Sequence, residues 1–226
     1  MVEVEGARSS RRPRGTTRQS DVIAAALAVA DQVGLDRLTI RAVARVAKVP
    51  TMSLYSHFSS KTELLDLMYR ELTMRLFVDE PHATWQEGVF AACGRIREVL
   101  LAHPRWVPLL SRPSRPLVLP WRERMLDLMI ADGFRPDQAF AALSSAILVA
   151  EGLVLLELAL VDVDGKSSIT ERVARLKQWA DEDASTGHPT TRETARSIPQ
   201  FDLSQNFSVA VRTYVTGLEN TPRPAT

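Results

Sequence analysis

The chain has 226 residues, of which 45% are hydrophobic and 24% charged, a composition typical of a globular protein with one large domain or two small ones. Its single cysteine, Cys93, excludes an intramolecular disulfide framework and a zinc site built from cysteines. The net charge of +1 is unevenly divided: residues 1–62 carry ten Lys and Arg against five Asp and Glu, and residues 63–226 carry 18 against 22. A basic segment ahead of an acidic body favours a polyanionic partner, although a solubilising tail would share this composition.

No apolar run approaches the length of about 18 residues that a membrane-spanning helix needs. The longest candidate, residues 146–161, is interrupted by Glu151 and Glu157. The first 15 residues are charged and are not followed by an apolar run, so they do not fit a signal peptide. We therefore predict a soluble, cytoplasmic protein without a membrane partner.

Helical patterns follow one another along most of the chain. Residues 1–19, rich in Arg and Ser, predict a disordered basic arm. Beyond the arm, apolar residues recur three and four positions apart, and strand patterning is nearly absent, which predicts an all-α fold. Gly34 stops the first helix, Thr39 caps the second, and a capping box beginning at Ser60 opens a longer one. The predicted helices span 20–33, 40–47, 51–58, 60–78, 84–102, 104–111, 119–132, 136–161, 168–183 and 203–218, with a long polar loop over 182–199.

Two short helices separated by Lys48, Val49 and Pro50 have the proportions of a helix-turn-helix. Its second helix would lie in a DNA major groove, with Leu54 and Phe58 as buried anchors and with hydroxyls available for bases and phosphates. The arginines of the arm could follow the backbone or enter a minor groove. The predicted DNA-binding residues are Arg11, Arg12, Arg14, Thr39, Arg41, Lys48, Thr51, Met52, Ser53, Tyr55, Ser56, His57 and Lys61.

The segments LTIRAVA (38–44) and VPTMSLYSHFSSKTELL (49–65) resemble the DNA-binding domain of TetR-type repressors. A plain helical bundle would explain their apolar spacing but not this polar set. One position departs from the family pattern, because Lys48 stands where the turn usually has Gly. A positive φ at a residue other than Gly costs roughly 1 kcal/mol, so either Lys48 offsets this cost by a phosphate contact or the turn differs.

The body is similar to the tetracycline-repressor subgroup over residues 121–161, around Asp132-Gly133-Phe134, and over the ending at 207–219. This resemblance implies an α-helical ligand-binding and dimerisation domain. The helices 136–161 and 203–218 would then pack with their mates as a four-helix bundle, although an internal core helix would also fit. The expected organisation is an arm over 1–19, a DNA-binding domain over 20–66, and a ligand-binding and dimerisation domain over 67–226.

The subgroup's drug sensors hold a magnesium–tetracycline complex through histidines, and the resemblance places Phe77 and the vicinity of Leu110 at those two positions. Neither can bind a metal, and the four histidines have no metal-binding spacing, so we predict no metal and no cofactor. An apolar or aromatic small molecule suits this body better. The predicted effector-binding residues, each of which could instead be ordinary core, are Trp85, Trp106, Leu110, Trp121, Met125, Met129, Phe140 and Ile147.

The leading functional prediction is a homodimeric repressor that a small hydrophobic ligand releases from a palindromic operator. An alternative keeps the DNA-binding dimer but makes the body a dimerisation or protein-interaction module without an effector. We do not predict an enzyme, because the sequence has no nucleophile–base pair, no Gly-rich phosphate loop and no paired carboxylates at a predicted pocket. Cys93 shares a helix face with Val89, Ile96 and Leu100 and is predicted to be a buried apolar residue.

Overall fold

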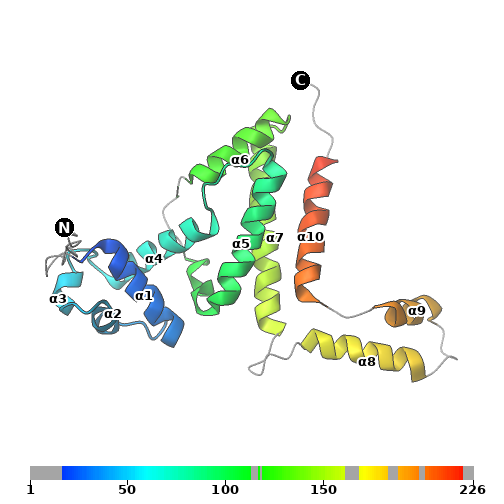
Figure 1. The fold of residues 1–226 in the computed structure, drawn as a ribbon, viewed down its shortest axis with the longest axis horizontal. Coiled ribbons are helices and arrows are strands. Elements are labelled where there is room, and N and C mark those ends of the chain that lie inside the picture. The colour runs from blue at the N-terminus through cyan, green and yellow to red at the C-terminus, as the bar shows by residue number, and fades with distance from the viewer. Residues whose placement is uncertain are drawn as a thin grey trace, which may run out of the picture. The chain divides into compact units, whose positions relative to one another are not determined.

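The computed structural model describes residues 17–112, 117, 119–160, 168–182, 188–198 and 202–220. These residues form helices and connecting turns without a strand, which confirms the all-α prediction (Figure 1). The chain divides into two compact units, Met1–Met68 and Tyr69–Thr226. The domain boundary expected from the sequence lay after residue 66.

In the N-terminal unit, α1 packs against α2 and α2 against α3. Residues three and four apart along each helix lie on one side, so these helices bury a continuous set of apolar side chains. That set includes Val22, Ala26, Leu38, Val43, Leu54, Phe58 and Leu64. The helices are α1 (Gln19–Val33), α2 (Ile40–Ala47), α3 (Thr51–Leu54) and the first turns of α4 (Lys61–Leu76), which continues into the C-terminal unit.

In the C-terminal unit, α7 packs against α5, α6 and α10, and α8 packs against α9. Figure 1 shows α5, α7 and α10 running alongside one another. The predicted face around Cys93 is confirmed as buried, together with Val89, Ile96 and Leu100. The described helices of this unit are α5 (Trp85–Ala102), the 3-10 segment η1 (Pro104–Leu109), α6 (Pro120–Ala131), α7 (Pro136–Leu160), α8 (Ser168–Glu182), α9 (Pro189–Ser197) and α10 (Leu203–Glu219).

The prediction of a single long loop over residues 182–199 is wrong, because this stretch contains α9. Pro189 begins α9 at a position where the missing N–H is not needed. Arg192 and Arg196 then donate to the Ala180 carbonyl near the end of α8, over 3.1 and 2.6 Å. That carbonyl has no partner within its own helix, so the contact between the two helices stabilises both. Local polarity indicated a loop, and tertiary packing overrides it.

Two other segments differ from prediction in detail. The helix predicted over 51–58 ends at Leu54, because the Ser56 hydroxyl donates to the Ser53 carbonyl over 2.8 Å and the next backbone bond runs from His57 back to Leu54. The segment predicted over 104–111 is a 3-10 helix, since Pro108 has no N–H to donate inside it.

One face of α7 is apolar and exposed within the single chain. Phe140, Leu148, Leu155 and Leu156 lie on this helix with 41–66% of their surface accessible. By length and composition α7 is also apolar enough to cross a membrane, and 33% of its most apolar 18-residue window is buried. An apolar face of this extent is stabilised by contact with another apolar surface.

Candidate DNA-binding surface and body cavity

The turn between α2 and α3 holds Lys48 in the left-handed region, with φ 58° and ψ 41°. The N–H of Lys48 donates to Arg45 and that of Val49 to Ala44, the pair of bonds that closes a Schellman motif. At the other end of α2, the Thr39 hydroxyl accepts from the Ala42 N–H over 3.2 Å, as predicted for an N-cap. The turn therefore keeps the geometry that usually favours Gly, although its residue is Lys.

The predicted DNA-binding residues of the helix-turn-helix are mostly exposed, whereas the two residues predicted to anchor it are buried. Leu54 and Phe58 are buried, as expected, whereas Met52 is 78% exposed. Tyr55 packs its ring against Phe58 with the centroids 6.1 Å apart, and the His57 carbonyl accepts from the Gln19 side chain over 3.1 Å. Of the other predicted residues, Thr39, Arg41, Lys48, Ser53, Ser56 and Lys61 are exposed and Thr51 is half-buried. Arg11, Arg12 and Arg14 lie outside the described residues.

The start of α4 differs slightly from the predicted capping box. The Ser60 hydroxyl accepts from the Glu63 N–H over 3.2 Å, but the Glu63 carboxylate accepts from the N–H and hydroxyl of Ser59, over 2.7 and 2.6 Å. These hydrogen bonds lower the pKa of Glu63 below its ordinary value. The arrangement fixes the first turn of α4 and leaves Lys61 exposed.

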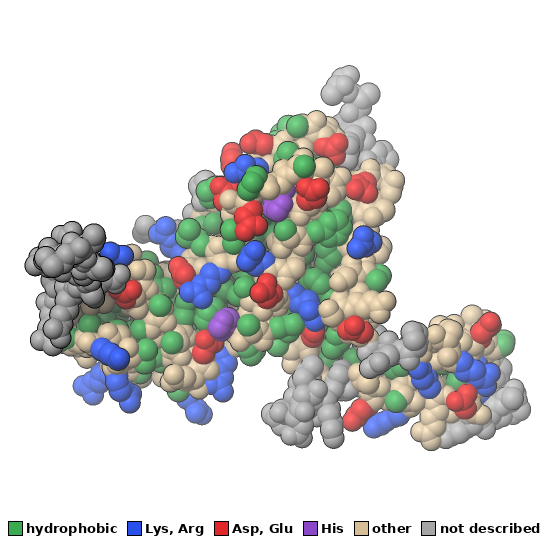
Figure 2. Space-filling model, viewed as in Figure 1, with side chains coloured by type: hydrophobic (Ala, Val, Ile, Leu, Met, Phe, Trp, Pro, Cys, Tyr) green, Lys and Arg blue, Asp and Glu red, His purple; other side chains and the backbone are tan. Residues whose placement is uncertain are grey.

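Three exposed arginines of the N-terminal unit were not among the predicted DNA-binding residues: Arg18, Arg37 and Arg45. Arg45 lies one helical turn after Arg41 and therefore on the same face of α2. The spacing of four between these two arginines, with Lys48 three residues further, was the available sequence signal. Figure 2 shows Lys and Arg side chains gathered on the surface of this unit, as a phosphate-binding surface requires.

Five of the eight predicted effector-binding residues are buried, and the three tryptophans among them contact other rings. Trp121 lies 4.9 Å from Phe77 between ring centroids, and the Trp85 indole donates to Asp132 over 2.8 Å. Trp106 stacks on His103 at 3.7 Å with the rings nearly parallel. Trp85, Trp106, Trp121, Met125 and Met129 are buried, Leu110 and Ile147 are half-buried, and Phe140 is 53% exposed on α7.

Trp85 borders a cavity of about 320 Å³, and a second cavity, of about 310 Å³, lies between α5 and α10. Its α5 wall includes Phe90, Cys93, Gly94 and Arg97, and its α10 wall includes Phe207. None of these residues was predicted as an effector contact, because they come from two segments more than a hundred positions apart. The sequence signal nearest to this cavity is Gly94, one of two glycines inside α5.

The described residues contain no group of three or more His, Cys, Asp and Glu side chains placed to hold a metal ion. Burial raises the pKa of the Cys93 thiol to about 12, so the thiolate is scarce at neutral pH. This thiol lies 3.9 Å from the Ala146 carbonyl.

These features define a protein with a helix-turn-helix for DNA and a separate helical body. The chain belongs to the TetR family of bacterial regulatory proteins: the family model "Bacterial regulatory proteins, tetR family" matches residues 22–68, and the model "Tetracyclin repressor-like, C-terminal domain" matches residues 78–221. The resemblance noted in the sequence is thereby confirmed for both parts of the chain.

Curated proteins similar to this chain are also regulators. The HTH-type transcriptional repressor DrrR1 of Streptomyces coeruleorubidus is 32% identical over 156 residues, which make up 66% of this chain and 56% of the relative. The tetracycline repressor protein class G of Vibrio anguillarum is 32% identical over 140 residues, 59% of this chain and 66% of the relative. The matched stretches span between 43% and 66% of the curated relatives' own length.

Solved structures show the same fold. The transcriptional regulator SCO7222 of Streptomyces coelicolor matches with a TM-score of 0.70 and 22% identity, covering 90% of this chain and 98% of that one. ActR of the same organism, solved in complex with actinorhodin, matches with a TM-score of 0.66 and 23% identity, covering 91% and 98%.

Proposed function

We propose that this chain is a homodimeric repressor that binds a palindromic operator and is released when a small hydrophobic ligand binds its body. The observation that carries the proposal is the exposed set of hydroxyl and arginine side chains on the helix-turn-helix, held over buried Leu54 and Phe58. In such an arrangement α3 reads base edges, and Arg41 and Lys61 hold phosphates on either side of it. Two of the curated relatives, DrrR1 and the class G tetracycline repressor, are repressors, which supports this direction of regulation.

Operator binding is tested by gel shift and footprinting on the intergenic DNA next to the gene. Replacing Tyr55 or Lys61 by Ala should weaken operator binding by about tenfold while leaving the dimer intact. Replacing Arg11, Arg12 and Arg14 by Ala should flatten the salt dependence by roughly one unit for each phosphate that is no longer bound. Arg175→Ala, exposed on α8, is the control for a general loss of charge. Loss of the dimer in the Tyr55 and Lys61 variants would make these residues structural instead.

The proposed dimer pairs the exposed apolar face of α7, and α10, with a second copy. Leu148, 66% exposed on α7, should then be buried in the dimer. Sedimentation should show that Leu148→Glu is a monomer. Its operator affinity in a gel shift should be reduced, because a single DNA-binding unit contacts only one half-site. Met74→Glu, on α4 and 63% exposed, is the matched control and should remain a dimer.

Release by a ligand requires coupling between two sites, and this coupling is reciprocal. Operator DNA should therefore weaken ligand binding by the same factor by which the ligand weakens operator binding. The buried Trp121 and Met125 remain our predicted contacts for an apolar effector, which would have to open the packed core. A thermal-shift screen with hydrophobic compounds provides ligands for this test. If the screen finds none while operator binding persists, the body is a dimerisation or protein-interaction module.

A further inference from the structure

The cavity between α5 and α10 is separate from the tryptophan-rich core and combines aromatic with cationic walls. Phe90 is half-buried on α5, and Phe207 is buried on α10. Arg97 reaches within 5.7 Å of the Phe207 ring centroid, and Arg212 within 5.9 Å of that of Phe90. The volume of about 310 Å³ is at the lower end of the range for small-molecule sites. Its size and walls therefore suit a compact molecule with a flat apolar body.

Gly94 lies on the α5 wall of the cavity and has open space beside it. Glycine inside a helix is less favourable than alanine by about 1 kcal/mol, so its position usually has a packing reason. Gly88, earlier on α5, has such a reason, because a Cβ there would collide with the Met125 side chain. A Cβ on Gly94 would meet no atom within 4 Å. The described chain therefore leaves open space at Gly94, into which a larger side chain would project.

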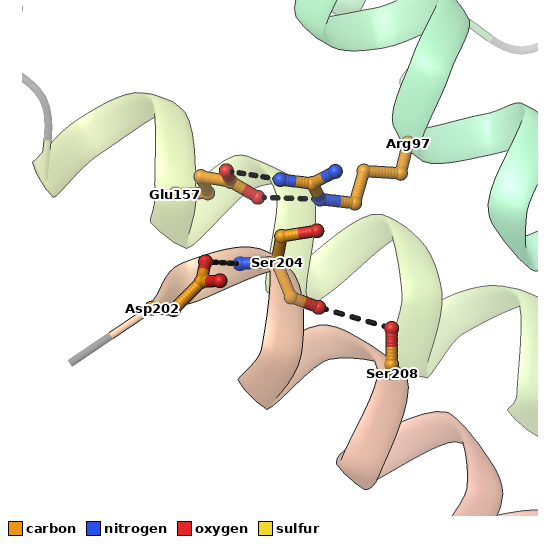
Figure 3. A network of polar contacts seen from close by, with 5 residues as sticks. All are labelled: Arg97, Glu157, Asp202, Ser204 and Ser208. Carbon is orange, nitrogen blue, oxygen red and sulfur yellow. Dashed lines mark hydrogen bonds and ion pairs between the residues drawn. The ribbon is translucent and has the colours of Figure 1, made fainter. Parts of the chain in front are cut away.

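The two arginines at the cavity differ in their partners. Arg97 donates to both carboxylate oxygens of Glu157 on α7, over 2.9 and 2.7 Å, so this pair is neutral as a whole. Figure 3 shows the ion pair beside Ser204, whose backbone N–H is held by Asp202 and whose carbonyl accepts from Ser208. Arg212 has no acidic partner among the described residues and is exposed at the cavity. The Arg212 guanidinium is therefore available to a bound molecule.

We propose that this cavity binds an aromatic carboxylate of one or two rings. The flat ring would lie between Phe90 and Phe207, where offset or edge contacts between aromatic rings are favourable. The carboxylate would accept hydrogen bonds from the Arg212 guanidinium, whose planar group matches its two oxygens. The Arg97–Glu157 pair holds the cavity wall in place between α5 and α7. The site itself does not depend on the proposed function, whereas any effect of the ligand on operator binding does.

The test uses the full-length protein, with 2-naphthoate as probe and the uncharged 2-naphthamide as its counterpart of the same shape. Isothermal titration should show that naphthoate binds about tenfold or more tightly than naphthamide. Arg212→Gln should remove this preference, because the glutamine side chain has no charge for the carboxylate. Arg175→Gln, which removes another exposed arginine, on α8, should bind both probes as the wild type does.

Side chains introduced at Gly94 test ligand binding separately from folding. Gly94→Leu should abolish naphthoate binding, and Gly94→Ala should raise the melting temperature, because neither a leucine nor an alanine side chain meets protein atoms at its Cβ. Undiminished binding by Gly94→Leu, or equal affinity of the wild type for the two probes, would overturn the proposal. Failure of naphthoate to bind at millimolar concentration would do the same. A monomeric Gly94→Leu would assign the space to a second copy, and the proposal would again be wrong.

If naphthoate binds as expected but leaves operator binding unchanged in a gel shift, the site is retained and its connection to the proposed repressor function is lost. If the wild type does not bind operator DNA at all, the proposed function fails and the binding measurements on the cavity remain valid.

Discussion

In the N-terminal unit the candidate site is a surface, whereas in the C-terminal unit it is a cavity. The DNA-binding residues of the helix-turn-helix are mostly polar and exposed, and Leu54 and Phe58 beneath them are buried. In the body, Trp85, Trp106 and Trp121 are buried in contacts with other rings, and the cavity between α5 and α10 is lined by other residues. A surface site is defined by which side chains are left out of the core, and a cavity by how segments far apart in sequence pack.

The largest effect that separates these two arrangements is expected in the body. Trp121 is buried against Phe77, so Trp121→Ala should destabilise the C-terminal unit by about 3–5 kcal/mol in urea unfolding. Phe140→Ala, at a side chain that is 53% exposed, should change stability by less than about 0.5 kcal/mol in the monomer. A small cost for Trp121→Ala together with loss of a hydrophobic ligand would instead show that this ring borders an open effector site.

The corresponding test in the N-terminal unit uses two residues of α3. Leu54→Ala should destabilise the N-terminal unit by about 2–5 kcal/mol and abolish operator binding, because Leu54 is buried beneath the helix-turn-helix. Met52→Ala, at a side chain that is 78% exposed, should leave the stability nearly unchanged and affect DNA affinity alone. Equal stability of the two variants would contradict the division into anchor and contact surface.

This division also explains what could be predicted from the sequence. The Thr39 cap, the Gly34 stop and the Leu54–Phe58 anchor depend on residues within a few positions of one another, and all three are found. The position of α9 was missed, because Arg192 and Arg196 stabilise it by binding the end of another helix. The cavity was missed for the same reason, since Gly94 and Phe207 meet only when α5 packs on α10.

A smaller effect is expected at the turn that departs from the family pattern. Lys48 has a positive φ, so Lys48→Gly should be more stable than Lys48→Ala by about 1 kcal/mol. Both variants remove the same charge, so a phosphate contact by Lys48 should reduce the salt slope of operator binding equally in both, by about one unit. Thermal unfolding measures the first effect and gel shifts at several salt concentrations the second. Equal stability of the two variants would mean that the turn relaxes without strain.

The two units also contain carboxyls whose pKa values shift in opposite directions. In the head, hydrogen bonds from Ser59 lower the pKa of Glu63, so its stabilising contribution is present above the ordinary value of 4.5 and is lost as the pH falls through the lowered one. In the body, burial on α7 raises the pKa of Glu151 above 4.5. Folding therefore favours the protonated form of Glu151, and the contribution of this carboxyl is lost as the pH rises from 4.5 through the raised value.

Replacing each carboxyl by its amide should change the stability of the protein in opposite directions for the two units, and each change should depend on pH. Glu151→Gln should be more stable than the wild type at pH 7, because the amide removes a charge that is disfavoured on the apolar helix α7, and the difference should vanish below pH 4.5. Glu63→Gln should be less stable than the wild type at pH 7, with the difference shrinking as the pH falls below 4.5. Urea unfolding at several pH values measures both differences. If the stability of both variants at pH 7 changes in the same direction relative to the wild type, the local surroundings of these two carboxyls do not determine how the stability depends on pH.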